Sequence, residues 1–225
     1  ALEASGYIMR SSDRGRSWSA PITIWDHQPY GCGNHTFTLL ADGRLLKSCE
    51  RVPVWGSYPK CVSSSGCFWS DDGGRSWSRP ESWVTLPLRG TMENHIAETN
   101  SGNLVMAVRS QMGNVFLSRS TDRGRTWSHP QSTGLSASES MPSLTRIPST
   151  GHLLLVWNHA SYDHTYDHSG KRTPLTSAIS TDEGRHWIAI KNIEDAPDVE
   201  FSNIATSHVS NRRVLITYFT CRMED

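Results

Sequence analysis

One eight-residue pattern, Ser-x-Asp-x-Gly-x-(Ser/Thr/His)-Trp, occurs four times in the 225 residues of this chain. The copies occupy residues 11–18, 70–77, 120–127 and 180–187, which indicates one unit of supersecondary structure copied along the chain. We expect each Asp (Asp13, Asp72, Asp122 and Asp182) to accept hydrogen bonds from backbone N–H groups two residues on. The Gly should adopt a positive φ and the Trp should pack between adjacent units.

The segments between these patterns have the composition of strands and tight turns. A strand, a turn with Gly or Asn and an apolar strand follow one another in residues 35–46, 94–105, 142–156 and 203–216. Such segments predict two-stranded hairpins. With the strands that flank each Asp-containing pattern, they predict an all-β propeller of four-stranded antiparallel blades, with the pattern between the third and fourth strands.

The ends of the chain do not coincide with the boundaries of the expected blades. Residues 1–30 supply the last two strands of one blade, and residues 199–225 the first two strands of another. Three whole blades are expected between them, at residues 31–90, 91–137 and 138–198. Either the two half blades pair and close a four-bladed ring, or the single domain 1–225 is an arc of a larger propeller, which leaves sheet edges exposed.

Composition and charge exclude some classes of partner. The formal net charge is zero and Lys and Arg are scattered, so no nucleic acid or anionic membrane surface is expected. No apolar run approaches the roughly 20 residues that span a bilayer, and no signal peptide opens the chain. The chain begins at Ala1 without Met, which indicates processing or a fragment. We favour a secreted or periplasmic location.

The five cysteines leave the redox compartment open. Cys61 and Cys67 are close enough in sequence to bridge one loop in an oxidising compartment, and buried free thiols are the alternative.

The repeated pattern resembles the Asp-box of sialidase-type β-propellers. The chain is similar over essentially its whole length to the BNR-repeat, sialidase-like glycoside hydrolases. The resemblance implies a blade upstream of residue 1, so we favour about four blades of a six-bladed propeller over the closed ring. It also implies a glycan or acidic sugar as partner, with no cofactor and no metal. The boxes specify the fold more strongly than the function, because one fold hosts several activities.

Two residues in the blade 91–137 match a sialidase segment. There, a Glu opens the first strand and an Arg ends the second, as Glu93 and Arg109 do here, 16 residues apart. The resemblance implies that Glu93 is catalytic and that Arg109 binds substrate. The alternative is a surface Glu on a hairpin and an Arg that caps a strand.

The next blade continues the likeness. Residues 152–161 and 172–180 are similar to the run that delivers another substrate-binding Arg, which makes Arg172 a second arginine of a carboxylate clamp. A planar guanidinium suits a carboxylate because it donates two parallel hydrogen bonds. The alternative for Arg172 is a solvated loop residue. The Arg146-Ile-Pro148 triplet resembles a known sialidase motif, but it lies at the far end of its strand, so Arg146 is interpreted as structural.

The resemblance implies that the nucleophile position is lost. Sialidases use Tyr, activated by Glu, where other glycosidases use a carboxylate. The position that matches this Tyr is Phe201, followed by Ser202, and Phe has no oxygen. We expect the Phe201 ring to face the same cavity as Glu93.

The loop 159–168 repeats Tyr-Asp-His and is expected at the mouth of the channel. It could supply a general acid, contact sugar hydroxyls, bind a divalent metal or remain solvated. Tyr166 in this loop and Asn158 just before it are candidate substrate-binding residues. In the other long loop, Trp55 and Tyr58 could stack on a sugar or pack against Trp69.

These residues favour a sialidase-like exo-glycoside hydrolase, of exo-α-sialidase type, for an acidic sugar. A non-catalytic carbohydrate-binding or adhesion propeller is the first alternative. A propeller enzyme for another polysaccharide, such as a lyase, is the second.

Overall fold

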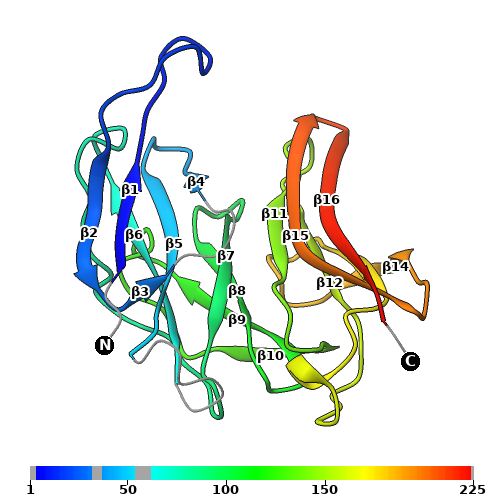
Figure 1. Ribbon diagram of the computed structural model, residues 1–225. Coiled ribbons are helices and arrows are strands. Elements are labelled where there is room, and N and C mark those ends of the chain that lie inside the picture. The colour runs from blue at the N-terminus through cyan, green and yellow to red at the C-terminus, as the bar shows by residue number, and fades with distance from the viewer. Residues whose placement is uncertain (1–3, 32–36, 54–61, 224–225) are drawn as a thin grey trace.

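Antiparallel β-sheets make up nearly all the regular structure of the chain (Figure 1). The structure is a computed structural model that describes residues 4–31, 37–53 and 62–223. Within those ranges there are sixteen strands and one short 3-10 turn, η1 (Asp167–Ser169). No helix in the described ranges is long and apolar enough to cross a membrane.

Two sheets have four strands in simple sequential order. The first comprises β7 (Met92–Glu98), β8 (Leu104–Arg109), β9 (Asn114–Ser120) and β10 (Gln131–Ser136). The second comprises β11 (Ser143–Arg146), β12 (Leu153–Asn158), β13 (Leu175–Ser180) and β14 (Ile188–Glu194). All neighbouring strands are antiparallel, so the predicted four-stranded antiparallel sheets are confirmed.

A third sheet is less regular. It contains β3 (Tyr30–Gly31), β4 (Phe37–Leu39), β5 (Leu45–Arg51) and β6 (Ser64–Ser70). Both β3 and β4 pair with β5 along the same edge, and β6 pairs with its other edge. Beyond β6, Ser78 and Val84 make isolated bridges in place of a continuous outer strand.

Two-stranded sheets lie at the ends of the arrangement. One pairs β1 (Ala4–Ile8) with β2 (Ile22–Gln28), and the other pairs β15 (Val199–Ser210) with β16 (Arg213–Arg222). Figure 1 shows the five sheets side by side in an open arc, with these two pairs at its ends. The described strands therefore do not close a ring. The number of blades and their boundaries stay predictions.

The second strand of each sequential sheet is the most buried. All six residues of β12 are buried, and so are Leu104–Val108 of β8. These strands are continuous apolar runs because a neighbouring sheet covers each of their faces. One cluster joins the β7–β10 sheet to the β11–β14 sheet through Leu117, Leu155 and Trp157. The arc is thus held together by apolar contacts between successive sheets.

The four Asp-containing patterns form the same turn. In each, the Ser hydroxyl accepts from the Gly N–H at 2.7–2.9 Å, and the Asp accepts from the N–H four residues on at 2.8–2.9 Å. The expectation of N–H groups two residues on was wrong, because the carboxylate spans the whole turn. The four glycines have φ between 82° and 86°, as predicted, where a side chain is strained.

Three of the four pattern tryptophans pack against the sheet that precedes their own. Trp77, Trp127 and Trp187 are partly buried, each against a cluster that joins two successive sheets. Trp18 differs from the prediction, since 58% of its surface is exposed. The reason is that no described sheet precedes the β1–β2 pair.

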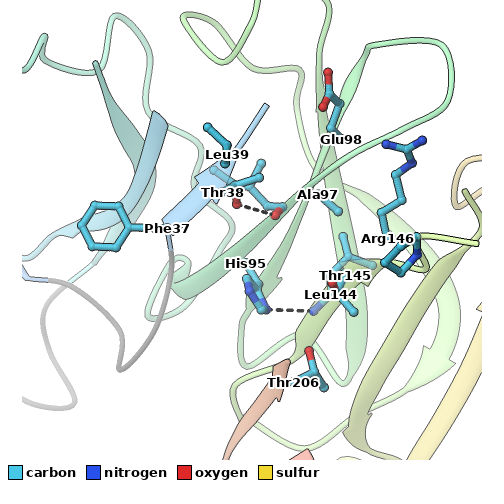
Figure 2. A pocket seen from close by; sticks show the side chains of 12 residues that line it. Phe37, Thr38, Leu39, His95, Ala97, Glu98, Leu144, Thr145, Arg146 and Thr206 are labelled. Carbon is cyan, nitrogen blue, oxygen red and sulfur yellow. Dashed lines mark hydrogen bonds between the residues drawn. The ribbon is translucent and has the colours of Figure 1, made fainter. Parts of the chain in front are cut away.

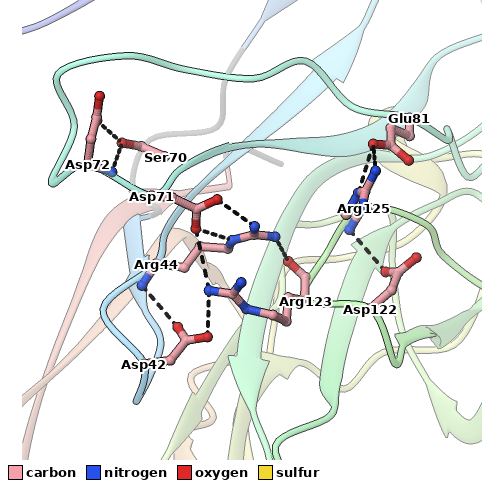
Figure 3. Close-up of polar contacts among 9 residues, drawn as sticks. All are labelled: Asp42, Arg44, Ser70, Asp71, Asp72, Glu81, Asp122, Arg123 and Arg125. Carbon is pink, nitrogen blue, oxygen red and sulfur yellow. Dashed lines mark hydrogen bonds and ion pairs between the residues drawn. The ribbon is translucent and has the colours of Figure 1, made fainter.

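Ion pairs reinforce one of these junctions (Figure 3). Arg44, which is buried, donates two hydrogen bonds of 2.7 Å to Asp71 and one of 3.0 Å to the carbonyl oxygen of Arg123 in the next sheet. Arg123 pairs with Asp42 at 2.5 Å. These contacts connect the turn between β4 and β5 to the pattern of the following sheet.

Cys67 is a buried free thiol, which contacts the carbonyl oxygen of Gly124 at 3.1 Å. Burial raises its pKa to about 12, so the thiolate is disfavoured. Cys61, its suggested partner, lies outside the described residues.

Candidate functional site

Glu93 and Arg109 meet at one end of β7 and β8. Nη1 of Arg109 donates to Oε2 of Glu93 at 2.6 Å. The register between the two strands shifts between Met92 and His95, and Glu93 has a φ of 39°. Such an irregularity re-aims a side chain, and here it places the Glu93 carboxylate against the guanidinium. The structure therefore brings together two of the residues selected from the sequence.

Behind this pair lies a buried carboxylate that the sequence reasoning missed. Glu139 is almost fully buried, and Oε1 accepts from Nη1 of Arg89 at 2.5 Å. The same oxygen lies 3.6 Å from Nη2 of Arg109. Two arginines thus share Glu139, which offsets the cost of burying their charges. Glu139 precedes β11 much as Glu93 opens β7. This similar position in two consecutive sheets is the feature of the sequence from which Glu139 could have been identified.

A further carboxylate, Glu50 at the end of β5, is close to Glu93. Its Oε2 accepts from the backbone N–H of Glu93 at 3.3 Å. Burial, and then the negative charge of Glu93, raise the pKa of Glu50. Nothing in its sequence context distinguishes Glu50 from a solvated residue, so only the fold reveals it.

Arg172 lies beside this network without joining it. Burial, and then the positive charge of Arg109, lower the pKa of Arg172. Its guanidinium is half-buried and makes no hydrogen bond or ion pair with any residue in the described ranges, and its Nε is a buried donor without a partner. Arg172 lines a cavity of about 570 Å³ together with Tyr166, His168, Glu200 and Arg222. A cationic group without a partner in a cavity is a candidate for binding an anion.

Asn158 does not line that cavity, and the expectation that it binds substrate was wrong. Its side chain is fully buried, and Nδ2 donates to the carbonyl oxygens of Arg172 at 2.8 Å and Phe201 at 2.9 Å. The apolar run of β12 carries the amide into the interior, where it connects two chain segments.

Phe201 also differs from the prediction. Only 3% of its surface is exposed, and the ring packs in a cluster with Leu154, Val156 and Leu175 between the β11–β14 sheet and the β15–β16 pair. The ring of Tyr218 meets it edge-on at 5.7 Å. The Phe201 ring therefore does not occupy a nucleophile position in the cavity. The side chain at this position of the strand points into the core, where an apolar ring is stabilised by packing.

The loop 159–168 contributes two side chains to the site. Tyr166, a candidate substrate-binding residue, lines the cavity, and Nδ1 of His168 lies 3.1 Å from Nη2 of Arg109. A guanidinium can only donate, so this ring nitrogen accepts and the imidazole is neutral. Among the described residues, no group of His, Cys, Asp or Glu is placed to hold a metal ion. Trp55 and Tyr58 lie outside the described residues.

Arg146 belongs to a different cavity, at the other end of the inner strands (Figure 2). This cavity has a volume of about 340 Å³ and is lined by residues of β4, β7, β11 and β15. Arg146 is exposed there near Glu98, whereas Glu93 lies at the opposite end of β7. Arg146 lies at the end of β11, as expected, but it is exposed, and no side-chain hydrogen bond or ion pair to another described residue gives it the structural role that was expected.

Comparisons with known proteins point to one family. A family model described as a BNR repeat-like domain matches residues 2–211. The chain is 26% identical over 190 residues to a sialidase of Bacteroides fragilis (strain YCH46), an alignment that covers 82% of this chain and 31% of that protein. The chain thus spans about a third of that relative's length.

Solved structures of sialidases share the fold. The NanB sialidase from Streptococcus pneumoniae superposes with a TM-score of 0.76 at 16% identity, over 94% of this chain and 32% of that one. The leech intramolecular trans-sialidase gives a TM-score of 0.70 at 20% identity, over the same shares. The family model covers nearly all of the sequence, and the chain therefore belongs to the BNR repeat-like domain family, with the fold of sialidase propeller domains.

Proposed function

We propose that the cavity beside Arg172, with the adjacent Glu93–Arg109 pair, is the sugar site of a sialidase-like exo-glycoside hydrolase for an acidic, sialic-acid-type sugar. The observation that carries the proposal is the half-buried guanidinium of Arg172, which has no partner among the described residues. A buried cation without a partner is costly, and a ligand carboxylate removes that cost with two parallel hydrogen bonds.

The neighbouring charges favour a single new anion at Arg172. Arg109 is already paired with Glu93 and lies near Glu139, so its charge is largely balanced. Arg172 has the positive charge of Arg109 nearby, which raises the benefit of a ligand carboxylate, and the negative charge of Glu200 acts in the opposite direction with a smaller effect. Tyr166 offers the sugar an aromatic face and a hydroxyl group in the same cavity.

Glu93 is the proposed catalytic carboxylate. Arg109 fixes one of its oxygens at the start of β7, which orients the group. In the proposed reaction an oxygen of water or of the Tyr166 hydroxyl bonds to the anomeric carbon and gives its proton to Glu93. The glycosidic C–O bond breaks, and the leaving alcohol takes a proton from solvent. Phe201 has no part in this reaction, because its ring lies in the core.

A second candidate function is a non-catalytic carbohydrate-binding or adhesion propeller. The strand β15 favours it, because its residue in the cavity is Glu200 and Phe201 is buried, so the strand offers the cavity no phenol oxygen for covalent catalysis. Both candidates require the same acidic sugar to bind at Arg172, and only the hydrolase requires turnover.

Two measurements on the native protein and on Arg172→Ala test the proposal. Calorimetry should detect N-acetylneuraminate binding to the native protein, and the variant should lose about 2 kcal/mol, roughly 30-fold in affinity, with two charge-assisted hydrogen bonds. Arg146→Ala is the matched control, since it removes an arginine from the far end of the inner strands.

Release of 4-methylumbelliferone from its α-sialoside then separates the two candidates. Turnover that falls in Glu93→Gln supports the hydrolase. Binding without turnover supports the adhesion module, and equal affinity in Arg172→Ala and the native protein contradicts both.

A further inference from the structure

The residue of β15 that faces the cavity is Glu200, not Phe201. Successive side chains of a strand point to opposite faces, and the Phe201 ring is directed into the core. Glu200, one position earlier, lines the cavity with Arg172. The strand that was expected to present an aromatic ring to the sugar therefore presents a carboxylate.

Among the residues that the structure describes, the charged side chains that line the cavity have a net charge of one positive. The described lining includes two guanidinium groups, Arg172 and Arg222, and one carboxylate, Glu200. His168 adds no charge, because its Nδ1 accepts from Arg109. The nearby charge of Arg109 is balanced outside the cavity by Glu93 and Glu139. One ligand carboxylate balances the net charge of these described side chains, and a doubly charged group exceeds it.

We infer that Glu200 is a specificity-determining residue that restricts the cavity to singly charged sugars and rejects sugars with a further anionic group. The inference rests on the proposed function and adds a limit on ligand charge. Glu200 lines the same cavity as Arg172, and its negative charge acts on the guanidinium without forming an ion pair with it. A second anionic group in the cavity meets Glu200 at short range, in surroundings partly shielded from water, where like charges repel strongly.

The geometry around Glu200 is well fixed by its neighbours. The N–H of Phe201 donates to the carbonyl oxygen of Arg172 at 2.9 Å, and Asn158 donates to the carbonyl oxygens of both residues. The backbone that carries Glu200 is therefore tied to the backbone that carries Arg172. A rigid spacing between a cation and an anion is what charge selection requires.

The test compares two ligands on the native protein and on Glu200→Gln, a variant of equal size without the charge. The ligands are N-acetylneuraminate and its 9-phosphate, and 9-O-acetyl-N-acetylneuraminate reports the effect of bulk alone. Affinities are measured by calorimetry at about pH 8, where a phosphate monoester is almost doubly charged. We expect the native protein to prefer N-acetylneuraminate, and Glu200→Gln to raise the affinity of the 9-phosphate relative to it by roughly tenfold or more.

Two further variants identify the cause. Glu200→Asp keeps the charge and should retain the native preference. Glu194→Gln is the matched control, because it removes a carboxylate that contacts Tyr218 and is not part of the cavity lining, and it should leave the preference unchanged. An unchanged ratio in Glu200→Gln, with N-acetylneuraminate still bound, overturns the inference alone. No binding of N-acetylneuraminate to the native protein overturns the proposed function and this inference together.

Discussion

The backbone N–H of Phe201 donates to the carbonyl oxygen of Arg172 at 2.9 Å and joins the start of β15 to the segment that leads into β13. The Phe201 ring is held in the core, and the guanidinium of Arg172 extends from the same junction into the cavity. The position of the unpartnered cation therefore depends on apolar packing. A change in the packing of Phe201 is therefore expected to move Arg172 as well.

The tryptophans of the repeated pattern should differ in their contribution to stability. Trp127→Ala should lower the free energy of unfolding by about 3 kcal/mol, near the lower end for buried aromatics, because its partly buried ring packs between two sheets. Trp18→Ala should cost less than about 1 kcal/mol, because that ring is mostly exposed. Urea unfolding measures both, and equal losses would show that the packing between sheets is not what the pattern contributes.

Much of this architecture could be predicted because the signal is local. The Ser, Asp and Gly of each pattern bond within eight residues, so sequence alone determines the turn. The exposure of Trp18 could not be predicted, because it depends on whether a sheet precedes β1. Ring closure is equally non-local, since it depends on strand edges at the two ends of the arc.

The buried pair of Arg89 and Glu139 should be far more sensitive than a surface pair. Arg89→Ala should cost about 3 kcal/mol or more, because Glu139 is nearly without exposure and its nearest remaining cation among the described ion pairs is Arg109, at 3.6 Å. Arg125→Ala breaks an exposed pair with Glu81 and should cost less than about 1 kcal/mol. Chemical denaturation compares them, and a loss at Arg89 as small as at Arg125 would contradict the assignment of a buried network.

Glu50 should make the stability of the protein depend on pH. Its pKa is raised in the folded chain above the ordinary value of 4.5, by burial and by Glu93, so folding favours the protonated form. The contribution of Glu50 to the free energy of unfolding is then greatest at acid pH. It falls as the pH rises above 4.5 and through the raised pKa of the folded chain. Glu50→Gln cannot ionise, and it should gain stability relative to the native protein as the pH rises.

The opposite trend is expected at Asp71. Hydrogen bonds from Arg44 lower the pKa of Asp71, so its stabilising contribution is present at neutral pH and lost as the pH falls through the lowered value. Asp71→Asn should therefore lose stability relative to the native protein as the pH rises. Unfolding free energies between about pH 3 and pH 8 measure both variants. Parallel curves for Glu50→Gln and the native protein would show that Glu50 is not perturbed.

The candidate site was only partly accessible from sequence, for a physical reason. Glu93 and Arg109 belong to one hairpin, so the resemblance of a single segment selected both residues, and the fold brings them into contact. Arg89, Glu139 and Glu50 come from other segments and meet only when sheets pack together. The prediction for Phe201 was wrong by one position along the strand. Successive side chains of a strand point to opposite faces, so a shift of one residue moves a side chain from the cavity to the core.

Asn158 should control the cavity through the backbone of Arg172. Asn158→Ala removes two buried hydrogen bonds and should cost about 2–3 kcal/mol of stability. It should also speed hydrogen exchange at the Phe201 amide and weaken N-acetylneuraminate binding by roughly tenfold, because Arg172 loses an anchor. Thr176→Val is the control, since this buried hydroxyl bonds Asn192 on β14 and does not contact the cavity. It should lower stability while leaving affinity unchanged; equal effects of both variants on affinity would mean that Asn158 is only structural.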